Sequence, residues 1–581
     1  MAQMNLTRQQ RMAGVLIPVF SIRGDRDLGI GDVSTLREFI DFSADLGFRY
    51  VQILPINETG PDNSPYNAIS SVALEPMTLD CSPAALEDLS AADFDGICEV
   101  FDLDAMREGA VDYEQVRKLK LSLLKRAFDS FWENHYEKGT ERDKQFGTFC
   151  KDESNWLNDY SVFRMLMARE GNNQNWQEWD ERYRTQEGAT DFITELFKKN
   201  PEKTDQQVSF FAYVQWVAFQ QWRELSAYAR EKGVFIMGDI PYGISVCSVD
   251  VFANREIFDL DWYGGAPPEQ LFKDDEFVQK WGQNWGIPLY RWDVMEANGF
   301  EWWKQRIAKT VDICGMFRVD HALGFYRIYS FPWNPIRNDE FLPLSGDEAA
   351  ERCDGRRPGF RPRPDESDEE KAANRADGER YFRMIKEAAG EAEVIAEDLG
   401  MVPDYVCPSL DDLQIAGMKV PQWEFTGVDV TPGVHYPTIS FATYATHDHA
   451  PIAAQWNDAR QKMADVEHES DEWWESRNFL HVLCQFAGIH VMDNQFPEFD
   501  RSVQEDLLRH LSLSNSNRIG IMISDLLGTT ERINVPGTMD GSNWSYRLDM
   551  TVEELRNSEE WQWMRDLSKK LLNDTGRMPS L

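Results

Sequence analysis

The sequence lacks any long block of basic residues and is poor in lysine. Its 581 residues include 60 Lys and Arg against 99 Asp and Glu, so the formal net charge is −39 at pH 7. Only 20 of the 60 basic residues are lysines, and the acidic residues are spread along the chain. Because so acidic a chain is repelled by phosphate backbones and anionic lipid surfaces, we expect neither nucleic acid nor a membrane as a partner.

Paired cysteines and long apolar runs are also missing. The eight cysteines lie far apart with no CxxC motif, which argues against a disulfide framework and a zinc site. No run of 18 apolar residues is present, and the first residues lack the apolar stretch of a signal peptide. We therefore expect a reduced, cytoplasmic protein with free thiols. As a separate expectation, it is a monomer or weak homo-oligomer.

Hydrophobic residues make up 42% of the chain, enough for a large folded core, and 20 residues are tryptophan. Tryptophans can pack in a core or stack on sugar rings, and the count alone does not separate the two roles.

One pattern recurs along the chain: an amphipathic helical stretch ends near a glycine and leads into a short apolar run that ends in a polar residue. Seven such strands are predicted, at residues 50–55, 234–241, 316–321, 393–400, 418–425, 439–448 and 518–527. Strands that alternate with helices pair in parallel. Because no GxGxxG turn follows any of them, the pattern favours a closed (β/α)8 barrel over a doubly wound sheet.

The spacing between these strands is uneven, which predicts one catalytic barrel over residues 1–581 with large subdomains inserted around its C-terminal face. Residues 80–205 are predicted to form a mostly helical insertion. Residues 242–300 are rich in Gly, Pro and Trp and are predicted to be a loop-rich lid over the barrel mouth. Residues 335–378 contain the densest acidic run and are predicted to be an exposed, mobile loop.

Four predicted strands end in a carboxylate, and active sites of such barrels lie at the C-terminal ends of the strands. The four residues are Asp239, Asp320, Glu397 and Asp448. Arg318 precedes Asp320 by two positions, so both side chains are expected on the same side of the strand, where the cation favours the ionised carboxylate. His447, directly before Asp448, is a candidate donor to a substrate hydroxyl.

These motifs together resemble the 4-alpha-glucanotransferases, also called amylomaltases or disproportionating enzymes, of the α-amylase superfamily. The resemblance runs from about residue 13 to 548. Besides RVDH, EDLG and HD, it rests on GVLIPVFSIRGDRDLGIGD (14–32), VQILPINETGPDNSPYNAISSVALEP (51–76), GQNWGIPLYRWD (282–293) and ERINVPGTMDGSNWSYRL (531–548).

The resemblance implies a role for each matching residue. Asp320 matches the nucleophile, Glu397 the general acid/base and Asp448 the carboxylate that grips and distorts the sugar at subsite −1. The other matching positions bind substrate: Ser64, Tyr66, Asp239, Gln283, Trp285, Arg318, His447 and Asn543. The implied partners are α-1,4-glucans, such as maltodextrin or fragments of starch and glycogen, and glucose. The implied chemistry needs no metal or organic cofactor.

The sequence departs from the family pattern near the expected acceptor contacts. RVDHALGF has Ala322 and Leu323 where RIDHFRGF is common, and HDHA has His449 and Ala450 in place of an HDND-type motif. The loop that usually reads PPDYF is PPEQLF here (267–272). Acceptor preference, product length and ring formation are the properties that these changes would affect.

The resemblance predicts a retaining double displacement with a covalent glucosyl-enzyme, in which negative neighbours raise the pKa of Glu397. Three alternatives are open at this stage. They are a retaining α-glucan hydrolase of the same superfamily, a non-catalytic α-glucan-binding protein, and a barrel whose carboxylates hold Mg²⁺.

Overall fold

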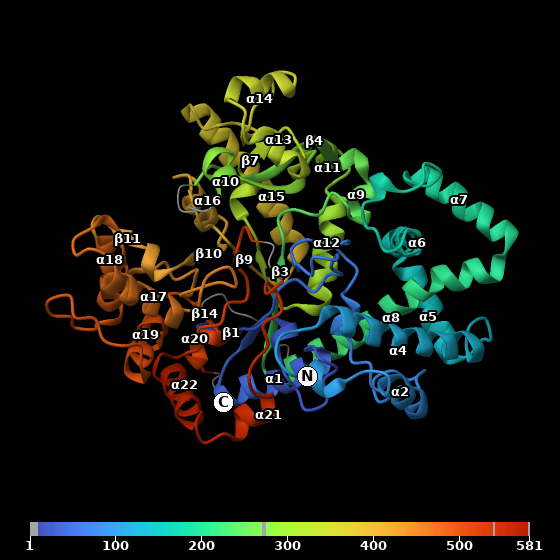
Figure 1. The fold of residues 1–581 in the computed structure, drawn as a ribbon, viewed down its shortest axis with the longest axis horizontal. Coiled ribbons are helices and arrows are strands. Elements are labelled where there is room, and N and C mark those ends of the chain that lie inside the picture. The colour runs from blue at the N-terminus through green and yellow to red at the C-terminus, as the bar shows by residue number, and fades with distance from the viewer. Residues whose placement is uncertain (1–9, 270–274, 539–540, 579–581) are drawn as a thin grey trace.

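Eight parallel strands form a closed barrel at the centre of the computed structural model, which describes residues 10–269, 275–538 and 541–578. Around the barrel each strand lies beside its neighbours in chain order (Figure 1). The strands are β1 (Met12–Leu16), β2 (Tyr50–Gln52), β3 (Phe235–Ile240), β6 (Met316–Val319), β9 (Glu393–Ala396), β10 (Ala416–Lys419), β13 (Ser440–Ala442) and β14 (Arg518–Met522). The predicted (β/α)8 barrel is confirmed.

Six of these strands lie within predicted runs, β10 overlaps the run 418–425 by its last two residues, and β1 is the one that the sequence pattern did not single out. No glycine precedes it in the sequence, so the helix–glycine–strand pattern could not mark it. β1 pairs with β14 on one side and β2 on the other, and thereby closes the barrel. Gly14 leaves room for the ring of Tyr50, which a Cβ atom at this position would approach to 2.1 Å.

Helices surround the barrel, as the sequence predicts. Those that follow its strands include α1 (Val33–Leu46), α8 (Pro201–Glu231), α12 (Glu301–Ile313), α15 (Asp368–Ala389) and α17 (Ile452–Asp465). The first of them, α1, ends at Gly47, whose left-handed φ of 92° suits a residue without a side chain.

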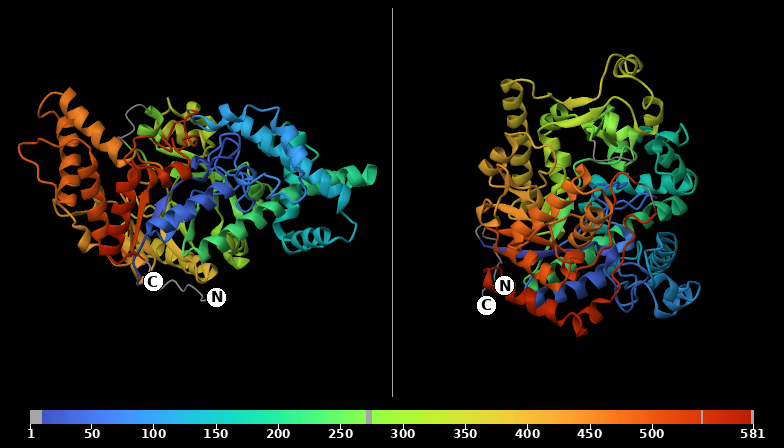
Figure 2. Two further views of the ribbon diagram at one scale, coloured as in Figure 1. Left: turned by 90° about the horizontal axis from the view of Figure 1, so that it is seen from below. Right: turned by 60° about the vertical axis from the view of Figure 1, so that its left-hand side comes forward.

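Two groups of helices flank the barrel on opposite sides (Figures 1 and 2). The first comprises α4 (Tyr113–Asn134), α5 (Glu141–Asp152), α6 (Ser154–Arg169) and α7 (Gln186–Lys199). The second comprises α17, α18 (Asp471–Ala487) and α19 (Arg501–Leu513). The first group lies in the segment where we expected a helical insertion.

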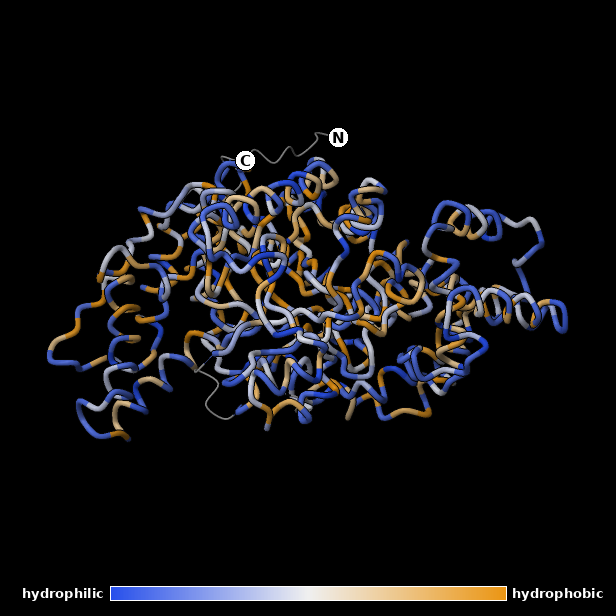
Figure 3. Tube along the Cα trace, turned by 90° about the horizontal axis from the view of Figure 1, so that it is seen from above, coloured by the Kyte–Doolittle hydropathy of each residue, from blue (hydrophilic) through white to orange (hydrophobic). Residues whose placement is uncertain are grey.

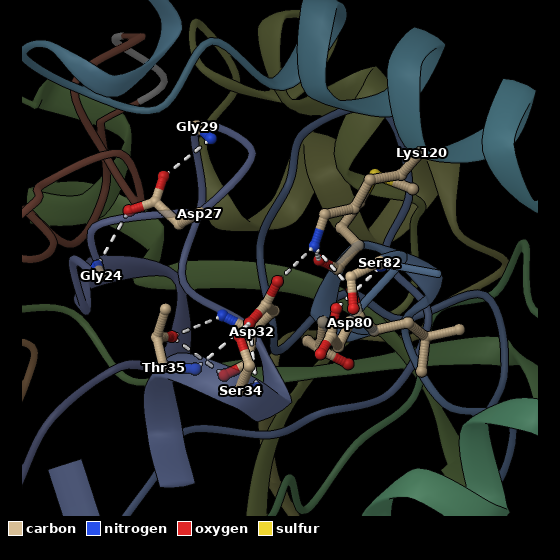
Figure 4. Close-up of polar contacts among 12 residues, drawn as sticks. Gly24, Asp27, Gly29, Asp32, Ser34, Thr35, Asp80, Ser82 and Lys120 are labelled. Carbon is tan, nitrogen blue, oxygen red and sulfur yellow. Dashed lines mark hydrogen bonds and ion pairs between the residues drawn. The ribbon is translucent and has the colours of Figure 1, made fainter. Parts of the chain in front are cut away.

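A buried lysine fixes α4 to the barrel (Figure 4). Lys120 is fully buried, and its ammonium group lies 3.1 Å from Asp32 Oδ2 and donates to the carbonyls of Met77 and Leu79. Asp32 is also the N-cap of α1, where it accepts from the amides of the first turn. A buried ammonium without such partners would strongly destabilise the fold.

The expectation of a loop-rich segment at 242–300 is wrong in one important part. β4 (Phe258–Ala266) and β5 (Gln283–Tyr290) join β7 (Ile328–Phe331) and β8 (Gly359–Arg361) in a four-stranded antiparallel sheet beside the barrel. The glycines that indicated loops are needed for pairing here. A Cβ atom on Gly265 would lie 1.8 Å from the carbonyl oxygen of Gln283 on the paired strand.

The acidic run near 365–370 lies only partly in a loop, because Asp365 and Glu366 precede a helix and the remaining acidic residues begin it. Asp368, Glu369 and Glu370 form the first turn of α15, and the Ser367 side chain accepts from the Glu370 amide as the N-cap. Negative side chains are stabilised at a helix N-terminus, which explains this cluster without mobility.

Apolar stretches of the chain run through the centre of the molecule (Figure 3). In the described part of the chain, no helix combines the length and apolar character required to span a membrane. The first nine residues, where we saw no apolar leader, and residues 270–272 of PPEQLF lie outside the described residues.

Candidate active site

The four strand-end carboxylates meet at one end of the barrel. Asp239 lies near the end of β3, Asp320 directly follows β6, Glu397 directly follows β9, and Asp448 lies in the loop after β13. Because β3, β6 and β9 are adjacent parallel strands, their carboxyl ends place three of these side chains next to one another.

Arg318 of β6 binds three of the carboxylates. Its guanidinium lies 2.7 Å from Asp239 and 2.8 Å from Asp320, and 3.8 Å from Glu397. Burial alone would lower the pKa of Arg318, but Asp239 and Asp320 outweigh burial and hold it well above its ordinary value. The positive charge among these carboxylates is therefore permanent. In the part of the chain that the structure describes, no group of His, Cys, Asp or Glu side chains is arranged to hold a metal ion.

The same guanidinium nitrogen sets a limit on the distance between Asp320 and Glu397. It lies 2.8 Å from Asp320 Oδ1 and 3.8 Å from Glu397 Oε2, so these oxygens are separated by no more than the sum of the two distances. That limit includes the separation of about 5–5.5 Å found in retaining glycosidases.

Two backbone amides hold the carboxylate of Glu397. The amide of His321 donates to Oε2 at 2.8 Å, and the amide of Leu399 donates to Oε1 at 3.0 Å. Both donors lie in the turns that follow the barrel strands, so the barrel edge itself orients this side chain.

Burial raises the pKa of Glu397 to about 8, and the negative charge of Asp320 adds to the rise, while Arg318 opposes it. We expected a raised pKa but attributed it to Asp320 and Asp448. Desolvation is the larger cause, since the largely buried carboxylate has little contact with the water that would stabilise its charge. Glu397 therefore keeps its proton near neutral pH.

Asp448 lies in the opposite electrostatic setting. His447 Nε2 is 3.2 Å from its Oδ2, and the side-chain amide of Asn534 donates to its Oδ1 at 2.7 Å. Burial by itself would raise the pKa of Asp448, but these two contacts hold it well below its ordinary value. Arg532 also donates to the Asp448 carbonyl at 2.8 Å.

Sequence reasoning did not single out Asn534 and Arg532, although both belong to the motif at 531–548. Their position after β14, the last barrel strand, was the available signal, because that loop also lies at the carboxyl end of the barrel.

An aromatic group adjoins the carboxylates. The Tyr66 hydroxyl donates to Asp239 Oδ2 at 2.6 Å, and its ring stacks on His447 with centroids 4.9 Å apart. Trp544 lies 5.9 Å from each of these two rings. Sequence reasoning named its neighbour Asn543 instead.

The antiparallel sheet contributes Trp285 to the site. Its ring meets the imidazole of His321 edge to face at 4.8 Å, next to Asp320. The Trp285 indole donates to Gln283 at 3.1 Å, and 39% of the tryptophan is exposed. Gln283 and Trp285 thus lie beside the carboxylates as an accessible pair.

The described contacts of the remaining two predicted residues are within their own loops. The Ser64 hydroxyl accepts from the amide of Tyr66 at 3.3 Å. The Asn543 side chain accepts from the Val535 amide at 2.9 Å and donates to the Thr538 carbonyl at 3.1 Å. These contacts shape the loops that present Tyr66 and Trp544.

The residues that depart from the family pattern surround the same site. Ala322 is buried and its amide donates to the Glu397 carbonyl at 2.9 Å, and Leu323 is buried beside it. His449 hydrogen-bonds Thr446 and lies 5.0 Å from the half-exposed Trp423. Ala450 is partly exposed.

Comparison with known proteins gives one consistent result. A family model described as 4-alpha-glucanotransferase matches residues 17–551. A 4-alpha-glucanotransferase of Chlamydia caviae is 29% identical over 553 residues, which cover 93% of this chain and 91% of that protein. Its counterpart in Aquifex aeolicus is also 29% identical, over 98% of this chain and 99% of that protein.

Two solved structures share the fold. The amylomaltase of Streptococcus agalactiae, in complex with acarbose, has a TM-score of 0.73 at 25% identity, covering 98% of this chain and all of that one. The amylomaltase of Corynebacterium glutamicum has a TM-score of 0.72 at 20% identity, covering 96% of this chain and 75% of that one. With a family match over most of its length, the chain belongs to the 4-alpha-glucanotransferase family, whose members are glucan-transferring enzymes.

Proposed function

We propose that the protein transfers α-1,4-glucan segments from a donor malto-oligosaccharide to the 4-hydroxyl of an acceptor glucan or glucose, with retention of the α-linkage. One observation carries the mechanism: an arginine-bound carboxylate, Asp320, lies beside a buried, protonated one, Glu397. A nucleophile and an acid at this separation suit a double displacement.

In the first step, Asp320 attacks the anomeric carbon of the sugar at subsite −1. The bond between that carbon and the glycosidic oxygen breaks, and Glu397 gives its proton to the departing oxygen. The products are a covalent glucosyl-enzyme on Asp320 and a shortened glucan.

In the second step, Glu397 acts as a base on the 4-hydroxyl of the acceptor. The acceptor oxygen attacks the anomeric carbon, the bond to Asp320 breaks, and Glu397 regains its proton. Two inversions give net retention.

The residues around the carboxylates bind substrate in this proposal. Asp448, with the lowered pKa, accepts hydrogen bonds from hydroxyls of the −1 sugar, and His447 donates one. The aromatic and polar side chains that remain bind the glucan chain or the same sugar: Ser64, Tyr66, Asp239, Gln283, Trp285, Arg318 and Asn543.

Water competes with the acceptor for the glucosyl-enzyme. Transfer prevails only where an acceptor sugar is held in place, because positioning offsets the concentration of water. The exposed face of Trp285 is the proposed platform for that sugar. The inferred substrates are neutral α-glucans and glucose, and a reduced cytoplasm remains a prediction from the eight free cysteines.

Incubation with maltotriose tests this proposal. Transfer yields glucose together with maltotetraose and longer oligomers, whereas a hydrolase yields only shorter sugars, and a non-catalytic binding protein yields neither. Trp285→Ala should raise the ratio of hydrolysis to transfer in the same assay. An unchanged ratio would remove Trp285 as the acceptor platform.

A further inference from the structure

The turn after the proposed nucleophile has a backbone conformation that residues other than glycine rarely adopt. His321 has φ 43° and ψ 54°, in the left-handed region. A histidine holds this conformation only where its surroundings fix it, and such residues concentrate at functional sites.

This conformation directs two consecutive amides at the proposed acid. The amide of His321 donates to Glu397 Oε2 at 2.8 Å, and the amide of Ala322 donates to the Glu397 carbonyl at 2.9 Å. Both the side chain and the main chain of Glu397 therefore depend on the path of this turn.

The His321 ring connects the turn to the antiparallel sheet. Trp285 of β5 meets the ring edge to face at 4.8 Å, and Tyr242 meets it at 6.0 Å. Burial lowers the pKa of His321 to about 4, so the ring is neutral and packs between the other two without a charge. His321 thus contacts Trp285, which is accessible to a sugar, through its ring, and it contacts Glu397 through its backbone amide.

We propose that His321 is a positioning residue that couples occupation of Trp285 by a sugar to the orientation of Glu397. A sugar that stacks on Trp285 presses the indole against the imidazole, which fixes the turn and with it the amide that holds Glu397 Oε2. Occupation of the platform would then restrain the acid in the position that the amides of His321 and Ala322 define. This inference rests on the proposed transfer mechanism.

Two donor substrates distinguish a loss of alignment of Glu397 from damage to the nucleophile or to sugar binding. Maltotriose needs a proton on its departing oxygen, whereas fluoride leaves α-maltosyl fluoride without protonation. Azide, added as acceptor, attacks the glucosyl-enzyme without a general base. The fluoride reaction in azide therefore uses Asp320 and sugar binding but not Glu397.

The first variant, His321→Gly, keeps the amide and permits positive φ but removes the ring. We expect its kcat on maltotriose to fall by about 10- to 100-fold, the size of effect that misplaced catalytic groups produce. Fluoride release in azide should stay within about threefold of the wild type. His321→Asn, a residue that tolerates this backbone region, should recover part of the lost activity on maltotriose.

A double-mutant cycle tests the coupling itself. As a single substitution, Trp285→Ala should lower the rate on maltotriose more than the rate of fluoride release. This difference should vanish when Trp285→Ala is combined with His321→Asn. His490→Ala, which replaces an exposed histidine after α18, is the control and should leave both rates unchanged.

Equal losses on both donors in His321→Gly would overturn the inference, because they indicate damage to the fold or to sugar binding. A difference for Trp285→Ala that persists in the His321→Asn background would overturn it as well. The proposed transfer mechanism is tested separately. It would be refuted if the wild type formed no longer oligomers from maltotriose.

Discussion

The raised pKa of Glu397 predicts where the enzyme loses activity as the solution becomes alkaline. The first step needs a proton on Glu397, and burial raises the pKa of this carboxyl to about 8. We expect kcat/KM for maltotriose to be nearly constant below about pH 7, to be halved at about pH 8 and to fall about tenfold per pH unit well above it. Initial rates of glucose release at constant ionic strength measure this limb, and circular dichroism at each pH shows whether the protein stays folded.

The same shift has a thermodynamic consequence that needs no substrate. The ordinary pKa of the glutamate is 4.5, so the folded protein retains a proton that the unfolded chain releases between pH 4.5 and about 8. The stabilisation from this proton is complete below pH 4.5 and is lost as pH rises through about 8. At roughly 1.4 kcal/mol per unit, the loss amounts to about 5 kcal/mol.

Glu397→Gln removes the titration and so isolates this contribution. The free energy of unfolding of the variant minus that of the wild type, from urea titrations, should increase by several kcal/mol between about pH 5 and pH 9. An activity profile that is flat to about pH 10, or a difference in unfolding free energy that does not change with pH, would refute the assignment of a raised pKa to Glu397.

Three further predictions follow from the site and the composition. Asp320→Asn should lower transfer by orders of magnitude in a folded protein, since no neighbour can replace the nucleophile, and near-normal turnover would contradict its role. Asn534→Ala removes a hydrogen bond to Asp448 at 2.7 Å and should raise its pKa, so the acid limb of the pH–rate profile should move to higher pH; an unmoved acid limb would contradict this role. Transfer should survive molar KCl, because a neutral glucan is not steered by the net charge of −39, and loss of activity in salt would contradict that interpretation.

The barrel could be predicted because its signal is local and repeated. Four of the seven strands, β2, β3, β6 and β9, follow a helix and a glycine, and the other three were found as short apolar runs. No glycine precedes β1 in the sequence, so it escaped the rule. β4 and β5 escaped because glycines such as Gly265 indicate turns in isolation, and only the partner strand shows why a side chain is excluded there.

The carboxylates could be predicted for a similar reason: parallel strands bring their carboxyl ends together whatever the loops do. The supporting residues could not. Asn534 reaches Asp448 and Trp544 reaches Tyr66 through the shape of the loops after β14. His321 holds Glu397 through its backbone amide, and the identity of a residue does not reveal a contact made by its amide.

The sequence also could not show which of the clustered carboxylates carries the proton. Several carboxylates surround the guanidinium of Arg318, and they lie at unequal distances from its positive charge. Asp239 and Asp320 each lie within 2.8 Å of Arg318, whereas Glu397 is 3.8 Å away and Asp448 has its own partner in His447. Burial raises the pKa of Asp239 as well, although Arg318 and the Tyr66 hydroxyl contact it. Glu397 is held mainly by two neutral amides, so its ionisation is also costly. Between Asp320 and Glu397, the distance to one guanidinium thus separates the nucleophile from the acid.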